Sequence, residues 1–155
     1  MEYCRHSLMK SFKIITGERG EGKTTFILSH FPFCKGYVSL HRGEEYYLKK
    51  LESGEENLLL THRPIFKEEW KGWFINSNEF HSANDYLLSL DNSIVVLDEV
   101  GMLEVEEKGF FPFLTKAQNM NIDLIISVRR EFVDVVKDKF FPSISPLVIS
   151  VGRAP

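Results

Sequence analysis

Residues 12–25 read FKIITGERGEGKTT, and this stretch indicates the fold class more clearly than any other part of the sequence. Residues 12–16 form a short apolar run that is typical of a buried strand. A glycine-rich stretch follows directly, and a helix is predicted through about His30, because Pro32 cannot continue it. Further along the chain, similar aliphatic runs alternate with helical patterns, as in an α/β fold whose parallel sheet is covered on both faces.

Residues 17–24, GERGEGKT, match the phosphate-loop pattern G-x-x-x-x-G-K-[ST] between a predicted strand and a predicted helix. Glycines let backbone amides wrap a phosphate, and the helix N-terminus adds its positive end. We expect Lys23 to reach the outer phosphates and act in catalysis, and Thr24 to hold Mg²⁺. The alternative is a glycine-rich turn that only caps a helix. The expected nucleotide-binding residues are Gly17, Glu18, Arg19, Gly20, Glu21, Gly22, Lys23, Thr24 and Thr25.

A second motif consists of the apolar run 94–97 followed by Asp98 and Glu99, which is typical of a Walker B strand. A carboxylate at the end of such a strand can accept a hydrogen bond from Mg²⁺-bound water beside Thr24, so Asp98 is the expected second metal residue. Glu99 is expected to orient or polarise the attacking water. The alternative is an acidic pair that ends a buried strand at the surface.

The remaining periodicity predicts one domain over residues 1–155, with a mostly parallel central sheet. Two strand-like stretches flank the turn-rich sequence SGEE at 53–56, so they predict an antiparallel hairpin that leaves the main sheet. Asn76 and Glu79 resemble a capping box before a helix, and Pro112 is expected in the first turn of another helix. The further strands are expected at 37–41, 93–97, 122–128 and 146–151, the hairpin strands at 45–51 and 57–62, and the helices at 78–90, 110–120 and 132–140.

The pairing of GERGEGKTT (17–25) with LDEVGMLE (97–104) resembles a small family of P-loop nucleoside triphosphatases known from thermophiles and from human cells. The resemblance spans roughly residues 12–140. It implies a RecA-like sheet with a glutamate beside the Walker B aspartate, and Mg²⁺-dependent hydrolysis with broad base tolerance. Glu104 falls on the second motif of the family, which implies that it supports the residues that bind the ligand directly. The residues alone allow an equal alternative, in which Glu104 belongs to an acidic, solvent-exposed face formed by GMLEVEEK.

The phosphate loop departs from the family pattern, because Arg19 stands where the family has proline. Glu18 and Glu21 add two negative charges near a site for phosphates, so they must point to solvent or weaken binding. Arg129 follows the strand at 122–128, at the edge where ligands collect in open α/β sheets. It is a candidate for a catalytic contact with the terminal phosphate, with a surface charge as the alternative. Arg153 is a further candidate for this contact, with a solvated terminal charge as the favoured alternative.

Trp70 and Trp73 lie close together with Phe74, and they could stack on a nucleotide base or close an aromatic patch over the core. The five histidines show no metal-ligand spacing. Nineteen basic and 22 acidic residues give a formal net charge of −3 without a basic stripe, so no nucleic-acid partner is expected. Two cysteines and the absence of a long apolar run favour a cytoplasmic location without a membrane partner.

The function expected from these motifs is Mg²⁺-dependent hydrolysis of nucleoside triphosphates, such as ATP and GTP, to the diphosphate and phosphate. One alternative is a nucleotide or nucleoside kinase, which needs an acceptor pocket and usually an arginine-rich lid. The arginines are dispersed along this sequence. The other alternative is a nucleotide-gated switch or assembly module in which hydrolysis is slow.

Overall fold

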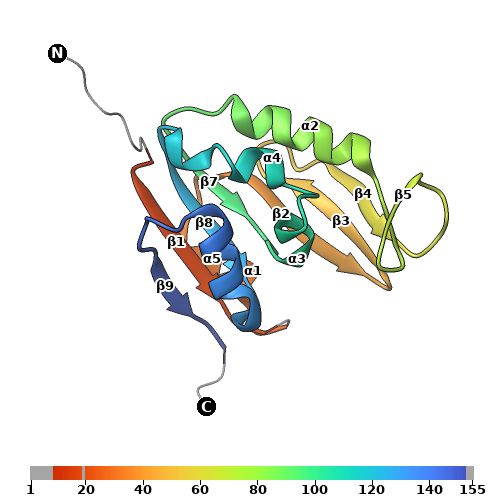
Figure 1. The fold of residues 1–155 in the computed structure, drawn as a ribbon, viewed down its shortest axis with the longest axis horizontal. Helices are drawn as coiled ribbons and strands as arrows, with labels where there is room; N and C mark the ends of the chain where they lie inside the picture. Colours follow the sequence, from red (N-terminus) through yellow and green to blue (C-terminus); the bar gives the residue numbers. More distant parts are fainter. Residues whose placement is uncertain (1–8, 19, 153–155) are drawn as a thin grey trace.

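A computed structural model describes residues 9–18 and 20–152, and its centre is one sheet in the order β5-β6-β4-β3-β2-β7-β8-β1-β9 (Figure 1). The strands of these ranges are β1 Ser11–Thr16, β2 Lys35–Arg42, β3 Glu45–Lys50, β4 Glu56–Thr61, β5 Glu68–Trp70, β6 Trp73–Ile75, β7 Ser93–Leu97, β8 Ile122–Val128 and β9 Leu147–Ser150. The α-helices are α1 Lys23–His30, α2 Ser77–Leu88, α3 Met102–Val105, α4 Phe111–Leu114 and α5 Val133–Phe140. Two 3₁₀ turns are Ala117–Asn119 and Arg130–Phe132.

The half of the sheet that contains β2, β7, β8, β1 and β9 is parallel, as the aliphatic runs predict. Ile14 of β1 and Leu97 of β7 both pair in register with Ile126 of β8, and all three side chains are buried. Parallel strands end at the same edge of a sheet. The loops that follow β1, β7 and β8 therefore meet at one place, where ligands bind in open α/β folds.

The other half of the sheet is antiparallel, and here one prediction is wrong. The predicted hairpin forms from β3 and β4, but it does not leave the main sheet, because β3 pairs directly with β2 from Tyr37 to Arg42. A second hairpin, β5 and β6, was not predicted and pairs with β4. The physical reason is that β7 pairs with one edge of β2 and leaves the opposite edge available to another strand.

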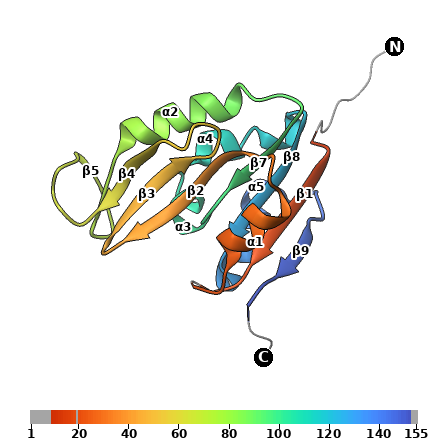
Figure 2. The ribbon, with the colours of Figure 1, turned by 180° about the vertical axis from the view of Figure 1, so that it is seen from behind.

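Helices cover both faces of the sheet, as expected, but unequally. Helices α2, α3, α4 and α5 lie on one face (Figure 1), and α1 covers the other (Figure 2). The larger apolar cluster, which includes Phe113 and Phe141, lies under the four helices. The smaller cluster lies under α1 and consists of Ile15, Ile27, Val38, Val96 and Ile125. None of the helices in the described residues is both long enough and apolar enough to cross a membrane.

Two helical predictions differ in outcome. Helix α2 begins after Asn76, whose side chain accepts a hydrogen bond from the Glu79 amide as predicted, although the Glu79 carboxylate bonds to Asn57. The single helix predicted over residues 110–120 is divided into α4 and the 3₁₀ turn Ala117–Asn119. Pro112 does lie in the first turn of α4. Helix α3 was not predicted, because four residues are too few to show a helical period.

Candidate nucleotide and metal site

The phosphate loop connects β1 to α1 at the carboxyl edge of the sheet. Gly20 and Gly22 have φ angles of +83° and +90°, a conformation that glycine adopts without a steric penalty. Gly22 is the N-cap residue of α1 and provides no side-chain hydrogen bond to the first turn. The amides of this turn thus lack a side-chain cap, and an anion could bind to them at the positive end of the helix.

Lys23 lies inside the phosphate loop with only 7% of its surface exposed. Its Nζ donates hydrogen bonds to the carbonyl oxygens of Gly17, at 3.0 Å, and Glu18, at 2.9 Å. The ammonium group is therefore held on the concave side of the loop, where it adds a full positive charge to the amides of the helix N-terminus.

Asp98 is 3% exposed and lies at the centre of a hydrogen-bond network. Its Oδ2 atom accepts from the Thr24 hydroxyl, at 2.6 Å, and from the Ser39 amide, at 3.2 Å. Its Oδ1 atom accepts from the Ser127 hydroxyl. These contacts come from α1, β2 and β8, so three elements fix the direction of one carboxylate.

Glu99 follows Asp98 but is exposed, because the backbone turns sharply between them. Its φ angle is +59°, a left-handed conformation that costs about 1 kcal/mol or more in a residue other than glycine. Ser127 stabilises this turn, since its hydroxyl accepts from the Glu99 amide at 2.7 Å and its carbonyl accepts from Val100 at 2.9 Å. Ser127 is a functional residue that was not predicted from the sequence. The only available signal was a hydroxyl within the apolar run of β8.

A cavity of about 300 Å³ collects most of the predicted binding residues. It is lined by Gly20, Gly22, Lys23, Thr24, Thr25, Asp98 and Glu99. Thr24 and Asp98 offer the oxygen donors that Mg²⁺ prefers, and a magnesium site needs only one or two protein ligands when phosphates and water complete it. The described residues contain no group of three or more His, Cys, Asp or Glu side chains that could hold a metal by itself. The donor set therefore fits magnesium bound together with a nucleotide.

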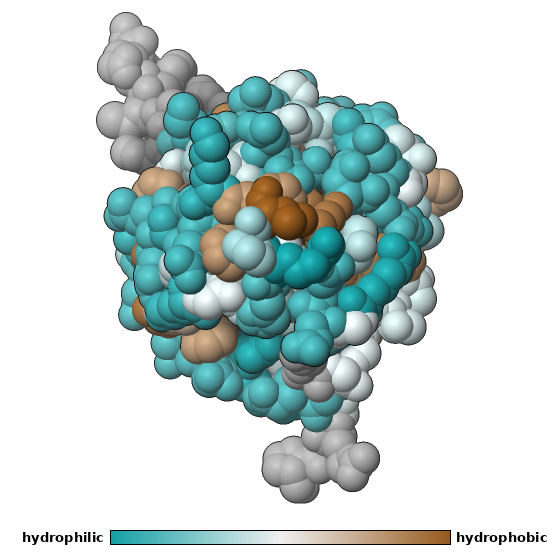
Figure 3. Space-filling view, turned by 90° about the vertical axis from the view of Figure 1, so that its right-hand side faces the viewer, coloured by the Kyte–Doolittle hydropathy of each residue, from teal (hydrophilic) through white to brown (hydrophobic). Residues whose placement is uncertain are grey.

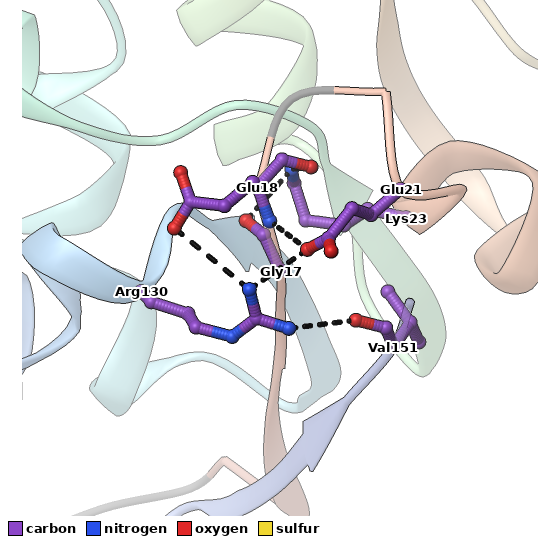
Figure 4. A network of polar contacts seen from close by, with 6 residues as sticks. All are labelled: Gly17, Glu18, Glu21, Lys23, Arg130 and Val151. Carbon is purple, nitrogen blue, oxygen red and sulfur yellow. Dashed lines mark hydrogen bonds and ion pairs between the residues drawn. The ribbon is translucent and has the colours of Figure 1, made fainter. Parts of the chain in front are cut away.

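The two acidic side chains of the phosphate loop are compensated by Arg130 (Figure 4). Its Nη1 atom is 2.8 Å from Glu21 Oε1 and 3.9 Å from Glu18 Oε2, and its Nη2 atom donates to the Val151 carbonyl at 3.0 Å. Glu21 Oε1 also accepts from the Glu18 amide at 2.5 Å. Glu21 thus turns toward an arginine and the backbone of its own loop. Arg19 and Arg153 lie outside the described residues.

Arg129 and Arg130 leave the end of β8 in different directions. Arg129 lines a second, larger cavity together with Lys23, Asp98 and Glu99, whereas Arg130 reaches the outer side of the phosphate loop. The structure therefore brings Arg129 to the same cavity wall as the expected catalytic residues.

Glu104 is buried, with 2% of its surface exposed, so it does not belong to an acidic solvated face. Its carboxylate accepts from the Gly101 amide, at 2.9 Å, and from the Phe110 amide, at 3.2 Å. Burial raises the pKa of this carboxyl group to about 7, and the nearby charge of Glu99 adds to the effect. Glu104 thus holds the loop that follows Asp98 and Glu99 in its folded shape.

The larger cavity has a volume of about 430 Å³ and begins at Asp98 and Glu99. It extends toward the antiparallel half of the sheet, where Trp70 and Trp73 line it and Phe74 does not. The Trp70 indole donates to Glu106 Oε1 at 2.9 Å. The two tryptophans therefore line a cavity that shares Lys23, Asp98 and Glu99 with the smaller one.

Comparison with solved structures shows that the fold is shared with two known proteins. The crystal structure of THEP1 from the hyperthermophile Aquifex aeolicus matches with a TM-score of 0.69 and 18% identity, over 90% of each chain. The solution structure of a human cancer-related nucleoside triphosphatase matches with a TM-score of 0.63 and 16% identity, over 93% of this chain and 89% of that one. No protein-family model matches the sequence, and no curated protein matches it significantly. The resemblance inferred from the two motifs is therefore confirmed at the level of the fold.

Proposed function

We propose that this protein binds a nucleoside triphosphate with Mg²⁺ and hydrolyses it to the diphosphate and phosphate. The observation that carries this proposal is the contact of 2.6 Å between the Thr24 hydroxyl and Asp98, in the cavity that Lys23 also lines. These three residues have the positions that a phosphate loop and a Walker B aspartate need. The name of the human structural neighbour, a nucleoside triphosphatase, supports the same activity.

Each side chain has a distinct task in the proposed reaction. The loop amides and Lys23 hold the phosphates, and Thr24 and Asp98 would hold the magnesium, the latter through water. When bound, Mg²⁺ neutralises negative charge on the phosphate oxygens. Glu99 accepts a proton from the attacking water, whose oxygen bonds to the terminal phosphorus as the bond to the leaving diphosphate breaks. Arg129 contacts the terminal phosphate as its charge changes in the transition state.

Phosphate release from ATP, GTP, CTP and UTP, with Mg²⁺ or with EDTA, tests this proposal. We expect release that depends on Mg²⁺ and varies little with the base. Lys23→Ala is expected to abolish release and weaken nucleotide binding, because it removes the cation that meets the outer phosphates.

Lys67→Ala is the control, since Lys67 is exposed in the loop between β4 and β5. It is expected to hydrolyse ATP like the parent protein. A Lys23→Ala protein that hydrolyses ATP at the parent rate, with an unchanged melting curve, would contradict the assignment.

A further inference from the structure

The 430 Å³ cavity offers more space than the phosphates and magnesium require, and its volume lies in the range of small-molecule sites. It shares Lys23, Asp98 and Glu99 with the smaller cavity. A molecule bound in the larger cavity would thus lie against the two acids at the end of β7. This position, beside the acid expected to accept a proton, suits a second reactant.

The far wall of the larger cavity is aromatic and held in place. The rings of Tyr46 and Trp73 have their centroids 5.5 Å apart, and Trp73 stacks on His62 at 3.8 Å. Glu106 fixes the other side of the hairpin by accepting from the Trp70 indole and from Lys71. Such a wall favours a planar aromatic ligand, because stacking on fixed rings loses little side-chain entropy.

The charges around the cavity indicate a neutral ligand. Its described lining contains three cationic side chains, of Lys23, Lys71 and Arg129. Lys71 Nζ is 2.8 Å from Glu106 Oε2 and is thus already paired. Lys23 and Arg129 follow β1 and β8, whereas the tryptophans lie on the β5 and β6 hairpin at the other end of the sheet. The aromatic end of the described lining therefore lacks an unpaired cation for a phosphate on the ligand.

The outer surface at this end of the sheet is mostly hydrophilic and carries only a small hydrophobic area (Figure 3). The large exposed apolar side chains of the described residues are scattered over several elements, with Ile65 in the loop between β4 and β5. A broad docking face for a protein partner is therefore not evident there. The aromatic side chains instead line a cavity of small-molecule size.

We propose that the larger cavity binds a neutral, planar aromatic molecule with a hydroxyl group, of the nucleoside class, as a phosphoryl acceptor. This inference rests on the proposed binding of a nucleoside triphosphate. The hydroxyl oxygen forms a bond to the terminal phosphorus, the bond to the bridging oxygen breaks, and the nucleoside diphosphate leaves. The hydroxyl proton passes to the Glu99 carboxylate and then to solvent. The products are the phosphorylated acceptor and the diphosphate, so water and the acceptor compete for one phosphoryl group.

The binding part of the proposal can be read directly from tryptophan fluorescence. The sequence contains only Trp70 and Trp73, and both line the cavity. Adenosine, guanosine, cytidine and thymidine are titrated with Mg²⁺ and ADP present, so that the phosphate site is already filled. At least one nucleoside is expected to change the fluorescence saturably.

Neighbouring tyrosines of β3 provide matched variants. Tyr46 lines the cavity, whereas Tyr47 does not and instead carries Arg42 over its ring at 5.2 Å. Tyr46→Ala is expected to weaken nucleoside binding about tenfold, the usual size of a lost stacking contact. Tyr47→Ala is expected to leave both nucleoside binding and phosphate release unchanged. Equal effects of the two variants would contradict the cavity as the binding site.

Phosphoryl transfer is tested with ATP labelled in its terminal phosphate, together with the nucleoside that gave the strongest fluorescence change. Label in the nucleoside monophosphate would support the proposal. A saturable fluorescence change with label found only in inorganic phosphate would overturn the acceptor role. If no nucleoside changed the fluorescence, the larger cavity would not be a nucleoside site. Phosphate release without any acceptor would still support the hydrolysis proposal in that case. A failure of the hydrolysis proposal is recognised separately, because ATP would then neither bind nor release phosphate.

Discussion

Asp98 and Glu99 are neighbours in sequence, but Asp98 is buried and Glu99 is exposed. Asp98 accepts hydrogen bonds from Thr24, Ser39 and Ser127, whereas Glu99 is exposed to the cavity. We therefore expect Glu99→Gln to retain Mg²⁺-nucleotide affinity but to turn over at least ~100-fold more slowly, as for a lost general base. Asp98→Asn is expected to lose Mg²⁺-dependent affinity.

Calorimetry with a nonhydrolysable ATP analogue, combined with steady-state rates, separates these two outcomes. If nucleotide no longer bound to Glu99→Gln, Glu99 would be a residue that holds the metal or the loop. The left-handed backbone at Glu99 is unchanged by this substitution, so a structural effect of the backbone is not expected to confuse the result.

Arg129 and Arg130 are expected to affect different steps. Arg129→Ala should lower turnover at least ~10-fold and change affinity less, because a contact with the transferring group is made mainly in the transition state. Arg130→Ala should instead lower nucleotide affinity, by up to about fivefold, since it leaves the charges of Glu18 and Glu21 without their cation.

The double variant Arg130→Ala with Glu21→Gln is the control for the second effect. It should recover most of the lost affinity, because the uncompensated carboxylate is then removed. Arg130 is therefore more than a neighbour of Arg129, since the fold brings it into an ion pair with Glu21. Affinity that stayed low in the double variant would indicate that the contact with Val151, rather than the charge, is what matters.

At the scale of elements, the segment between β7 and α4 depends on the buried carboxyl group of Glu104. Its pKa is about 7 in the folded protein, above the ordinary value of 4.5, so the folded state binds the proton more tightly than the unfolded chain. This contribution to stability is fully present below about pH 4.5 and is lost as the pH rises through 7.

A neutral side chain at position 104 removes this dependence on pH. We expect the melting temperature of Glu104→Gln, relative to that of the parent protein, to increase between about pH 5 and about pH 8. Thermal melts of both proteins across this range provide the measurement. A constant difference would show that the carboxyl group titrates as it does in water.

For the whole molecule, the two halves of the sheet join at β2, which pairs parallel with β7 and antiparallel with β3. Gly36 of β2 has a φ angle of +115°, and a Cβ atom there would lie 2.1 Å from the Val96 carbonyl oxygen. Gly36→Ala must therefore separate the two strands or distort β7, next to Asp98. We expect it to lower the free energy of unfolding by at least about 2 kcal/mol, as for a severe overpacking.

Gly43→Ala is a matched control, because Gly43 also has a positive φ, of +63°, but open space around its Cβ position. Its cost should be limited to the backbone strain of about 1 kcal/mol. Urea unfolding of the two variants compares them. Equal destabilisation would mean that the close approach to Val96 does not limit the packing of the sheet.

Local sequence was sufficient for the features whose information is local. The aliphatic runs predicted β1, β7 and β8, because a strand buried on both faces is mostly apolar. The loop at 17–24 was predicted from its glycines and Lys23, and Asn76 from its place before a helix, since loop conformation and capping depend on a few consecutive residues.

Tertiary structure alone decided the features that join distant parts of the chain. The contacts of Asp98 with Ser39 and Ser127, the ion pair of Arg130 with Glu21, and the burial of Glu104 all depend on how the sheet orders its strands. The continuation of β2 into two antiparallel hairpins likewise depends on a free strand edge, which leaves no pattern in the sequence. The aromatic cavity arises from this continuation, because it places the tryptophan hairpin on the side of the site opposite the phosphate loop.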